Sequence, residues 1–151
     1  PYLLFNLLKV ESEDESNYRN LQEVDVIYKL LETLAKRVRS SCVYSIGVIT
    51  PYRAQMELLL AKTSPIRFGA NVSLTVNTVD SFQGMENDVI IISCVRYTSN
   101  YFLQNEQRLN VALTRARQAL YIIGNYSLFK HCKPLYDLRE DAKKTKTLYR
   151  H

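Results

Sequence analysis

The sequence lacks several features that would assign it directly to a class of protein. None of its apolar runs approaches eighteen residues, so no membrane-spanning helix is expected, and no signal-peptide pattern opens the chain. Its four glycines stand apart at positions 47, 69, 84 and 124. They form neither a dinucleotide-binding fingerprint nor a phosphate-binding loop of the Gly-x-x-x-x-Gly-Lys-Ser/Thr type.

Cysteine is also scarce. The three cysteines, Cys42, Cys94 and Cys132, are widely spaced and contain no C-x-x-C pair, which argues against a disulfide framework or a zinc site. His131 beside Cys132 is a weak metal signal, because no partner pair accompanies it. We expect reduced thiols, no metal site, and an intracellular protein of the nucleus or cytoplasm.

The length and the charge favour one domain with an anionic partner. The chain has 151 residues, enough for a single core, and we expect one domain over residues 1–151. It begins with Pro1 rather than Met, which suggests a piece of a longer polypeptide. Its formal net charge is +5, with an acidic segment at 11–15 and a basic tail at 143–150.

Strand-like and helix-like segments alternate along the chain. We expect helices from Asn20 to Val38, over 51–62 and over 107–117, one or two helical pieces in the tail broken at Pro134, and loops over 11–16 and 97–104. Strands are expected over 2–8, 43–50, 74–79, 89–92 and 120–123. The alternation predicts a layered α/β fold with a mostly parallel sheet, and the continuous apolar runs predict strands buried on both faces.

The first helix carries two recognisable signals. Asn20 with Glu23 three residues later fits the spacing of a capping box. The apolar residues that follow are spaced three and four apart and predict one buried stripe, formed by Val24, Ile27, Leu31, Leu34 and Val38.

Two polar segments follow predicted strands. They are Thr50–Gln55 and Thr78–Glu86, and ligands of open α/β sheets bind at the carboxyl ends of strands. Hydroxyls, an amide and the N–H groups of an early helix suit the phosphates of a nucleic-acid backbone. The alternative for the second segment is a tight turn between core strands. For Tyr52 the two alternatives are stacking on a base and packing in the core. Pro51 is expected in the first turn of the helix that follows.

Three arginines form a third polar group. On a helix over 107–117, Arg108 and Arg115 share one face, whereas Arg117 lies on another with Asn110 and Thr114. The buried side of this helix is expected to hold Leu109, Ala112, Leu113 and Ala116. The two arginines on one face either form surface ion pairs with Glu106 or Glu86 or bind an anion such as a triphosphate.

A metal-dependent nuclease is a further alternative for the same region. Asp80, Glu86 and Asp88 would supply the carboxylates, but no catalytic lysine follows them at a useful spacing. The sequence therefore gives this alternative little support.

Three segments together resemble a known family. GVITPYRAQ (47–55), VNTVDSFQGMENDVIIISCVR (76–96) and RLNVALTRARQALYIIGN (108–125) resemble motifs four, five and six of superfamily 1 helicases, in the branch of senataxin and the up-frameshift RNA helicase. SNYRNLQEVDVI (16–27) resembles the segment that leads into the fourth motif. Met85 stands where a basic residue is frequent in that family.

The resemblance implies a three-layer RecA-like domain, the second of the two motor domains of an ATP-dependent helicase. The phosphate-binding loop and the Mg²⁺ ligands would then belong to the first RecA-like domain, and this chain alone would be inactive. The other partner would be single-stranded RNA or DNA.

The resemblance also implies roles for individual residues. Arg115 would be the catalytic arginine finger on the γ-phosphate of ATP, and Gly84 and Glu86 would lie near the triphosphate and ribose. Asn110 and Arg117 would hold the helix in place. Residues expected to line the nucleic-acid track, or to couple it to the ATP site, are Thr50, Pro51, Tyr52, Gln55, Thr78, Asp80, Ser81 and Gln83. The alternatives are a non-catalytic nucleic-acid or protein binding module and an unrelated α/β nucleotide-binding or nuclease domain.

Overall fold

The computed structural model describes residues 2–7, 13–14, 18–37, 43–96, 105–126, 129 and 132–150. The predicted loop at 97–104, and Val38, Cys42 and His131, lie outside these residues, as does most of the predicted loop at 11–16. Its residues 13–14 form a short strand where a loop was expected.

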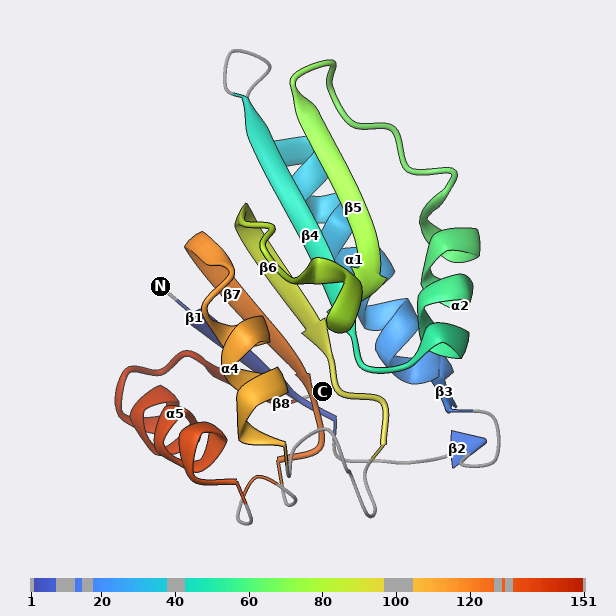
Figure 1. Ribbon diagram of the computed structural model, residues 1–151. Helices are drawn as coiled ribbons and strands as arrows, with labels where there is room; N and C mark the ends of the chain where they lie inside the picture. The colour runs from blue at the N-terminus through green and yellow to red at the C-terminus, as the bar shows by residue number, and fades with distance from the viewer. Residues whose placement is uncertain are drawn as a thin grey trace.

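A six-stranded parallel sheet forms the middle of the molecule (Figure 1). Its strands lie in the order β5-β4-β6-β7-β1-β8, and every neighbouring pair is parallel. The strands are β1 (Tyr2–Asn6), β4 (Tyr44–Thr50), β5 (Val72–Thr78), β6 (Asn87–Ser93), β7 (Ala116–Gly124) and β8 (Leu148–Arg150). A separate antiparallel pair joins β2 (Glu13–Asp14) to β3 (Arg19–Asn20).

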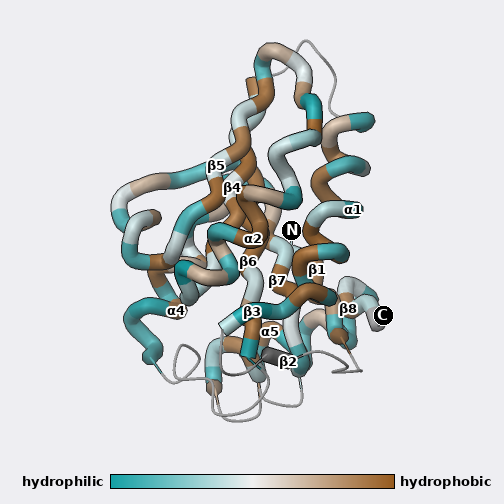
Figure 2. Tube along the Cα trace, turned by 90° about the vertical axis from the view of Figure 1, so that its right-hand side faces the viewer, coloured by the Kyte–Doolittle hydropathy of each residue, from teal (hydrophilic) through white to brown (hydrophobic). Residues whose placement is uncertain are grey.

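Helices cover both faces of the sheet, which gives three layers. One face packs against α1 (Leu21–Arg37) and α2 (Arg53–Thr63), and the other against α4 (Glu106–Leu113) and α5 (Lys133–Lys144). The central run of β6 is wholly apolar because the strand is buried on both faces. Val89 and Ile91 belong to the core under α1, and Ile90 and Ile92 belong to the core under α4. In Figure 2 the inner strands are largely brown, as buried strands should be. The predicted three-layer α/β fold of the RecA-like type is confirmed.

The first helix begins as predicted but only half of the capping box forms. The Asn20 side chain accepts a hydrogen bond from the Glu23 N–H at 3.0 Å. The Asn20 N–H, which a complete capping box would pair with the Glu23 side chain, donates to Gln55. The fully buried Glu23 carboxylate accepts hydrogen bonds from Ser93 and Val95 at the end of β6. The cap therefore ties α1 to the sheet. Of the predicted stripe, Val24, Ile27 and Leu31 are buried and Leu34 is half-buried.

The predicted helix over 107–117 is wrong in its second half. Helix α4 ends at Leu113, because the Thr114 hydroxyl turns back to the Asn110 carbonyl at 2.8 Å. Strand β7 then starts at Ala116, where pairing with Asn87 of β6 extends the sheet beyond the predicted strand 120–123. Arg115 lies between the two elements, so it does not share a helix face with Arg108, and Arg117 lies on the strand.

Four smaller differences from the predictions remain. Strand β5 lies at the edge of the sheet and is only partly buried. Of the two strands expected to be buried on both faces, β5 and β6, only β6 is. Pro51 precedes the N-cap Tyr52, which is itself extended, so it lies before the helix rather than in its first turn. Pro134 lies in the first turn of α5 rather than breaking a helix. Strand β8, which pairs with β1, was not expected.

A short turn returns the chain across one face of the sheet between β5 and β6. It contains a single 3-10 turn, η1 (Asp80–Phe82), whose Phe82 side chain is fully buried. Phe82 lies directly over Gly47 of β4, where a Cβ would come within 2.6 Å of its ring. Glycine at position 47 therefore leaves the space in which the ring anchors η1.

Candidate nucleotide and nucleic-acid site

The predicted site residues gather at opposite ends of the parallel strands. We call Gly84, Glu86, Arg115 and Arg117 the amino-edge cluster, because they precede β6 or lie at the start of β7. The residues around Thr50 and Thr78 lie where β4 and β5 end, and we call them the carboxyl-edge cluster. The seven residues of β6 separate the two ends by about 20 Å. The rule that ligands bind at carboxyl ends thus fits only one of the clusters.

The amino-edge cluster joins the turn before β6 to the residue before β7. The Asn87 N–H donates to the Arg115 carbonyl at 3.1 Å, which places Arg115 beside the exposed segment Gly84–Glu86. Gly84 has φ +84°, and a Cβ there would meet no atom within 4 Å. Its backbone is therefore open to a ligand, in a conformation that favours glycine.

The three arginines of motif six differ in what holds their guanidinium groups. Arg108 pairs with Asp80, and Arg117 lies 3.4 Å from the Glu86 carboxylate. Arg115 is half-buried, and its Nε donates to the Val111 carbonyl at 3.0 Å. Among the described residues its Nη groups have no partner. Arg115 is thus fixed at its base and can offer two parallel N–H donors to an anion.

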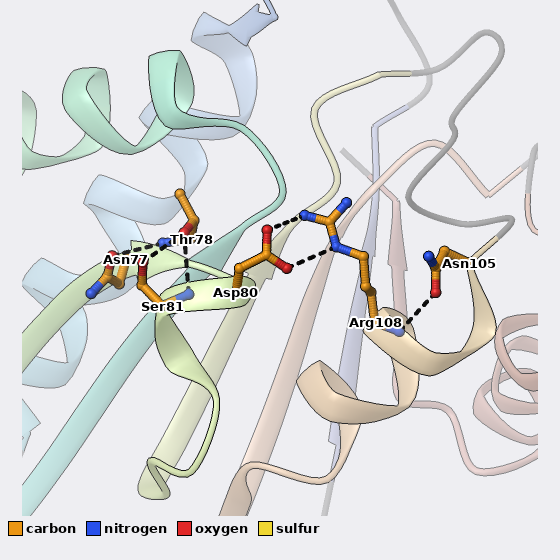
Figure 3. Close-up of polar contacts among 6 residues, drawn as sticks. All are labelled: Asn77, Thr78, Asp80, Ser81, Asn105 and Arg108. Atoms are coloured by element: carbon orange, nitrogen blue, oxygen red, sulfur yellow. Dashed lines mark hydrogen bonds and ion pairs between the residues drawn. The ribbon is translucent and has the colours of Figure 1, made fainter.

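The carboxyl-edge cluster presents hydroxyl groups at the end of β5 (Figure 3). The Thr78 and Ser81 hydroxyls lie 3.1 Å apart, and the Ser81 N–H points to the Thr78 hydroxyl at 3.4 Å. The Val79 N–H donates to the Thr50 carbonyl at 3.0 Å, which ties this turn to the end of β4. The exposed Ser81 and half-buried Thr78 form a small polar surface suited to a phosphate oxygen.

Beside these hydroxyls lies an aromatic group with a cation. The Tyr18 and Tyr52 ring centroids are 4.8 Å apart, and the Arg96 guanidinium lies 5.2 Å from the centroid of Tyr18. Burial raises the pKa of Tyr52, and the nearby Arg96 offsets part of that shift. Tyr52 is therefore neutral near pH 7. Its ring packs on an exposed tyrosine rather than closing the core, and Tyr18 itself is 43% exposed.

A buried polar network supports this aromatic group. The Gln55 side chain donates to the Asn20 carbonyl and the Ser93 hydroxyl, each at 3.1 Å, and accepts from the Asn20 N–H at 2.8 Å. Glu23 and Asn20 bind both backbone polar groups of Val95, which has φ +67°. The network therefore fixes the direction in which the chain leaves β6 toward Arg96.

Several predicted residues are placed for support rather than contact. Gln55, Pro51 and Thr50 are buried, and the Thr50 hydroxyl has no partner among the described residues. Gln83 is exposed and lines a small pocket, whereas Asn110 is exposed near the end of α4. The coupling role of Gln55 stays a prediction.

The nuclease alternative separates in space. Asp88 accepts two hydrogen bonds from Ser45, which hold its pKa below the usual value, and Asp80 pairs with Arg108. Within the described part of the chain, no three His, Cys, Asp or Glu residues could together hold a metal ion. No described helix is long and apolar enough to span a bilayer.

Sequence reasoning missed Tyr18 and Arg96 as members of the carboxyl-edge cluster. Each was inside a segment recognised by resemblance, but neither carries a motif signal of its own. The two rings and the cation come from three separate places, the β2–β3 connection, the β4–α2 connection and the residues after β6, so no spacing along the chain reveals the group.

Comparisons with known proteins agree with the motifs. The chain is 36% identical over 154 residues to helicase SEN1 of Saccharomyces cerevisiae and 34% identical over 149 residues to the probable helicase senataxin of Mus musculus. It is 37% identical over 147 residues to an uncharacterized ATP-dependent helicase of Methanocaldococcus jannaschii. Each match covers 95% of this chain but only 7%, 6% and 20% of the respective relative.

A solved structure and a family model add the fold and the family. The C-terminal domain of a possible DNA helicase from Lactobacillus plantarum superposes with a TM-score of 0.51 at 14% identity, over 83% of this chain and 73% of that chain. This likeness supports the fold alone. The family model described as an AAA domain matches residues 1–127. The chain belongs to this AAA-domain family, within the superfamily 1 helicase branch that contains senataxin and the up-frameshift helicase.

Proposed function

We propose that this chain is the second motor domain of an ATP-dependent helicase and supplies the arginine finger of its ATP site. The observation that carries the proposal is the state of Arg115. Its Nε is held by the Val111 carbonyl, its Nη groups have no partner among the described residues, and it lies beside the open backbone of Gly84. This arrangement suits an anion that arrives from outside the domain.

The remaining parts of the ATP site belong to a first RecA-like domain. Phosphoryl transfer requires Mg²⁺ and a phosphate-binding loop as well as a finger, and the described residues supply only the last of these. The finger acts when the two domains close around ATP. Hydrolysis then depends on closure, and a strand held by both domains moves as the cleft opens and closes.

The carboxyl-edge cluster supplies half of the track for single-stranded RNA or DNA. Thr78 and Ser81 offer hydroxyl groups to a phosphate, and the Tyr18–Tyr52 pair offers an aromatic face to a base. Stacking of this kind contributes about 1–3 kcal/mol per base and tolerates every sequence.

A non-catalytic binding module is the second candidate. It needs the carboxyl-edge cluster but has no use for a half-buried guanidinium, at the other end of the sheet, whose Nη groups have no partner among the described residues. The state of Arg115 therefore favours the motor.

The purified chain alone is expected not to hydrolyse ATP, because phosphate-binding loop and magnesium ligands are both missing from its described residues. Steady-state phosphate release at increasing chain concentration measures this. Turnover that scales with the chain and disappears in Arg115→Ala would show a complete ATP site here and would contradict the two-domain proposal.

Single strands are expected to bind the chain weakly and in a salt-dependent way, with a slope of about −0.7 per phosphate contact. Tyr52→Ala should weaken binding by about 1–3 kcal/mol without changing that slope, because it removes a stacking face and no charge. Fluorescence anisotropy over a salt series separates the two effects. Tyr136→Ala, which removes an exposed tyrosine of α5, is the matched control. Equal losses in both variants would exclude the proposed stacking site.

A further inference from the structure

An ion pair joins the turn of the carboxyl-edge cluster to helix α4. The Arg108 Nε donates to Asp80 Oδ1 at 3.0 Å and its Nη2 to Oδ2 at 2.5 Å (Figure 3). The contact is bidentate, and its geometry is more restrictive than that of a single-point ion pair. Asp80 directly precedes Ser81 and lies two residues after Thr78, so it moves with both hydroxyls.

The same helix connects Arg108 to Arg115. Asn105 caps α4 by accepting from the Arg108 N–H at 3.1 Å, so Arg108 lies in the first turn. At the other end the Val111 carbonyl holds the Nε of Arg115. Eight residues of α-helix span about 12 Å. Arg108 and Arg115 are thus attached to opposite ends of one short element.

The two segments are not packed tightly against each other where the ion pair crosses. A pocket of about 170 Å³ lies between η1 and α4, and Arg108 and Asp80 line it together with Gln83 and Val111. A cavity of this size is too small for a nucleotide, since ligand sites usually measure about 300–1,000 Å³. The cavity leaves room for η1 to shift relative to α4. The Arg108–Asp80 ion pair connects the two segments and would transmit such a shift from η1 to α4.

We propose that Arg108 is a positioning residue. It couples the binding of single-stranded nucleic acid at Thr78 and Ser81 to the position of Arg115 through helix α4. This inference rests on the proposed motor function. A phosphate bound at the two hydroxyls places negative charge beside the Asp80 carboxylate and competes with it for the Arg108 guanidinium. The Arg108 side chain then shifts toward the phosphate, and helix α4 shifts with Arg108. Because the Val111 carbonyl of α4 holds the Arg115 Nε, Arg115 moves toward the position in which it contacts ATP.

The test is steady-state ATP turnover of the full-length protein with and without a uridine or a thymidine oligonucleotide. Arg108→Gln is expected to keep the turnover measured without strand, because neither Arg115 nor its Val111 contact is altered. Stimulation by the oligonucleotide should fall by about ten-fold, a typical size for coupling between two sites. The double variant Asp80→Asn/Arg108→Gln should lose no more stimulation than Arg108→Gln, because both changes remove one link.

Two controls separate coupling from a general loss of structure. Arg53→Gln breaks a similar exposed ion pair with Glu57 on α2 and should leave stimulation unchanged. The melting temperature of Arg108→Gln should match that of the wild type, because partly exposed ion pairs add little stability.

Arg108→Lys tests the bidentate geometry. It keeps the positive charge without the forked guanidinium and should restore stimulation only in part.

Three results would overturn the inference, and they differ from one another. Full stimulation in Arg108→Gln would show that the ion pair transmits nothing. Equal loss with and without strand, at an unchanged melting temperature, would place Arg108 on ATP itself. A wild-type protein that neither oligonucleotide stimulates would remove the proposed function first, and the coupling with it.

Discussion

Arg115→Ala in the full-length protein is expected to lower ATP turnover by about 10³-fold or more, the lower end for removal of an arginine finger. The guanidinium meets the γ-phosphate only when the cleft is closed, so its loss acts on the chemical step. Affinity for single strands in the absence of nucleotide should change little, because Arg115 lies at the opposite end of β6 from Thr78. Turnover and strand affinity are measured on the same preparations.

Two neighbouring changes test whether this arginine is the right one. Arg115→Lys should restore little activity, since an ammonium group cannot supply the bidentate fork. Arg117→Ala should be milder, because Arg117 already faces Glu86 on the surface. Near-normal turnover in Arg115→Ala with an inactive Arg117→Ala would assign the finger to Arg117 instead. Normal turnover in both would remove it from this segment.

Phe82→Ala is expected to lower the free energy of unfolding by about 3–5 kcal/mol, the usual cost of truncating a buried aromatic residue. Phe82 is fully buried and fills the space over Gly47, so its loss leaves a cavity on the α4 face of the sheet. It also anchors η1, and strand binding should weaken with stability. Urea unfolding followed by circular dichroism measures the first effect and anisotropy the second.

The Gly47 contact supplies an independent control. Gly47→Ala in the wild type should cost about 1–3 kcal/mol through overpacking against the Phe82 ring. In the Phe82→Ala background this cost should shrink, because the alanine methyl occupies part of the vacated space. Leu60→Ala, at an exposed position of α2, should stay within about 0.5 kcal/mol. If Phe82→Ala cost no more than Leu60→Ala, the ring would not anchor the turn.

Periodicity predicted the layers and most of the elements, because burial on two faces leaves a strong pattern. The run Val89–Ile92 predicted the central strand β6, and the spacing of Val24, Ile27 and Leu31 predicted the buried stripe of α1. The helix over 107–117 was extended too far because Ala116 fits a helical spacing as well as a strand. Pairing of Ala116 with Asn87 decided between them, and such long-range pairing is absent from local sequence.

The candidate site was predictable in composition but not in arrangement. The motifs indicated Thr78, Asp80 and Arg115. The predicted helix over 107–117, however, put Arg108 and Arg115 on one face. The structure instead pairs Arg108 with Asp80 and leaves the Nη groups of Arg115 without a partner among the described residues. Pairing between residues 28 positions apart depends on how η1 folds over the sheet, where the Phe82 ring packs over Gly47.

The most direct test of the central claim compares two ligands in the full-length protein, ADP and ADP with aluminium fluoride, each with Mg²⁺. An arginine finger acts on the transferring phosphoryl group, so it should contribute to binding of the transition-state analogue alone. The account predicts that Arg115→Ala leaves ADP affinity unchanged and weakens the analogue by about 10²-fold or more. Equal weakening of both ligands, or of neither, would contradict the assignment of Arg115 as the finger.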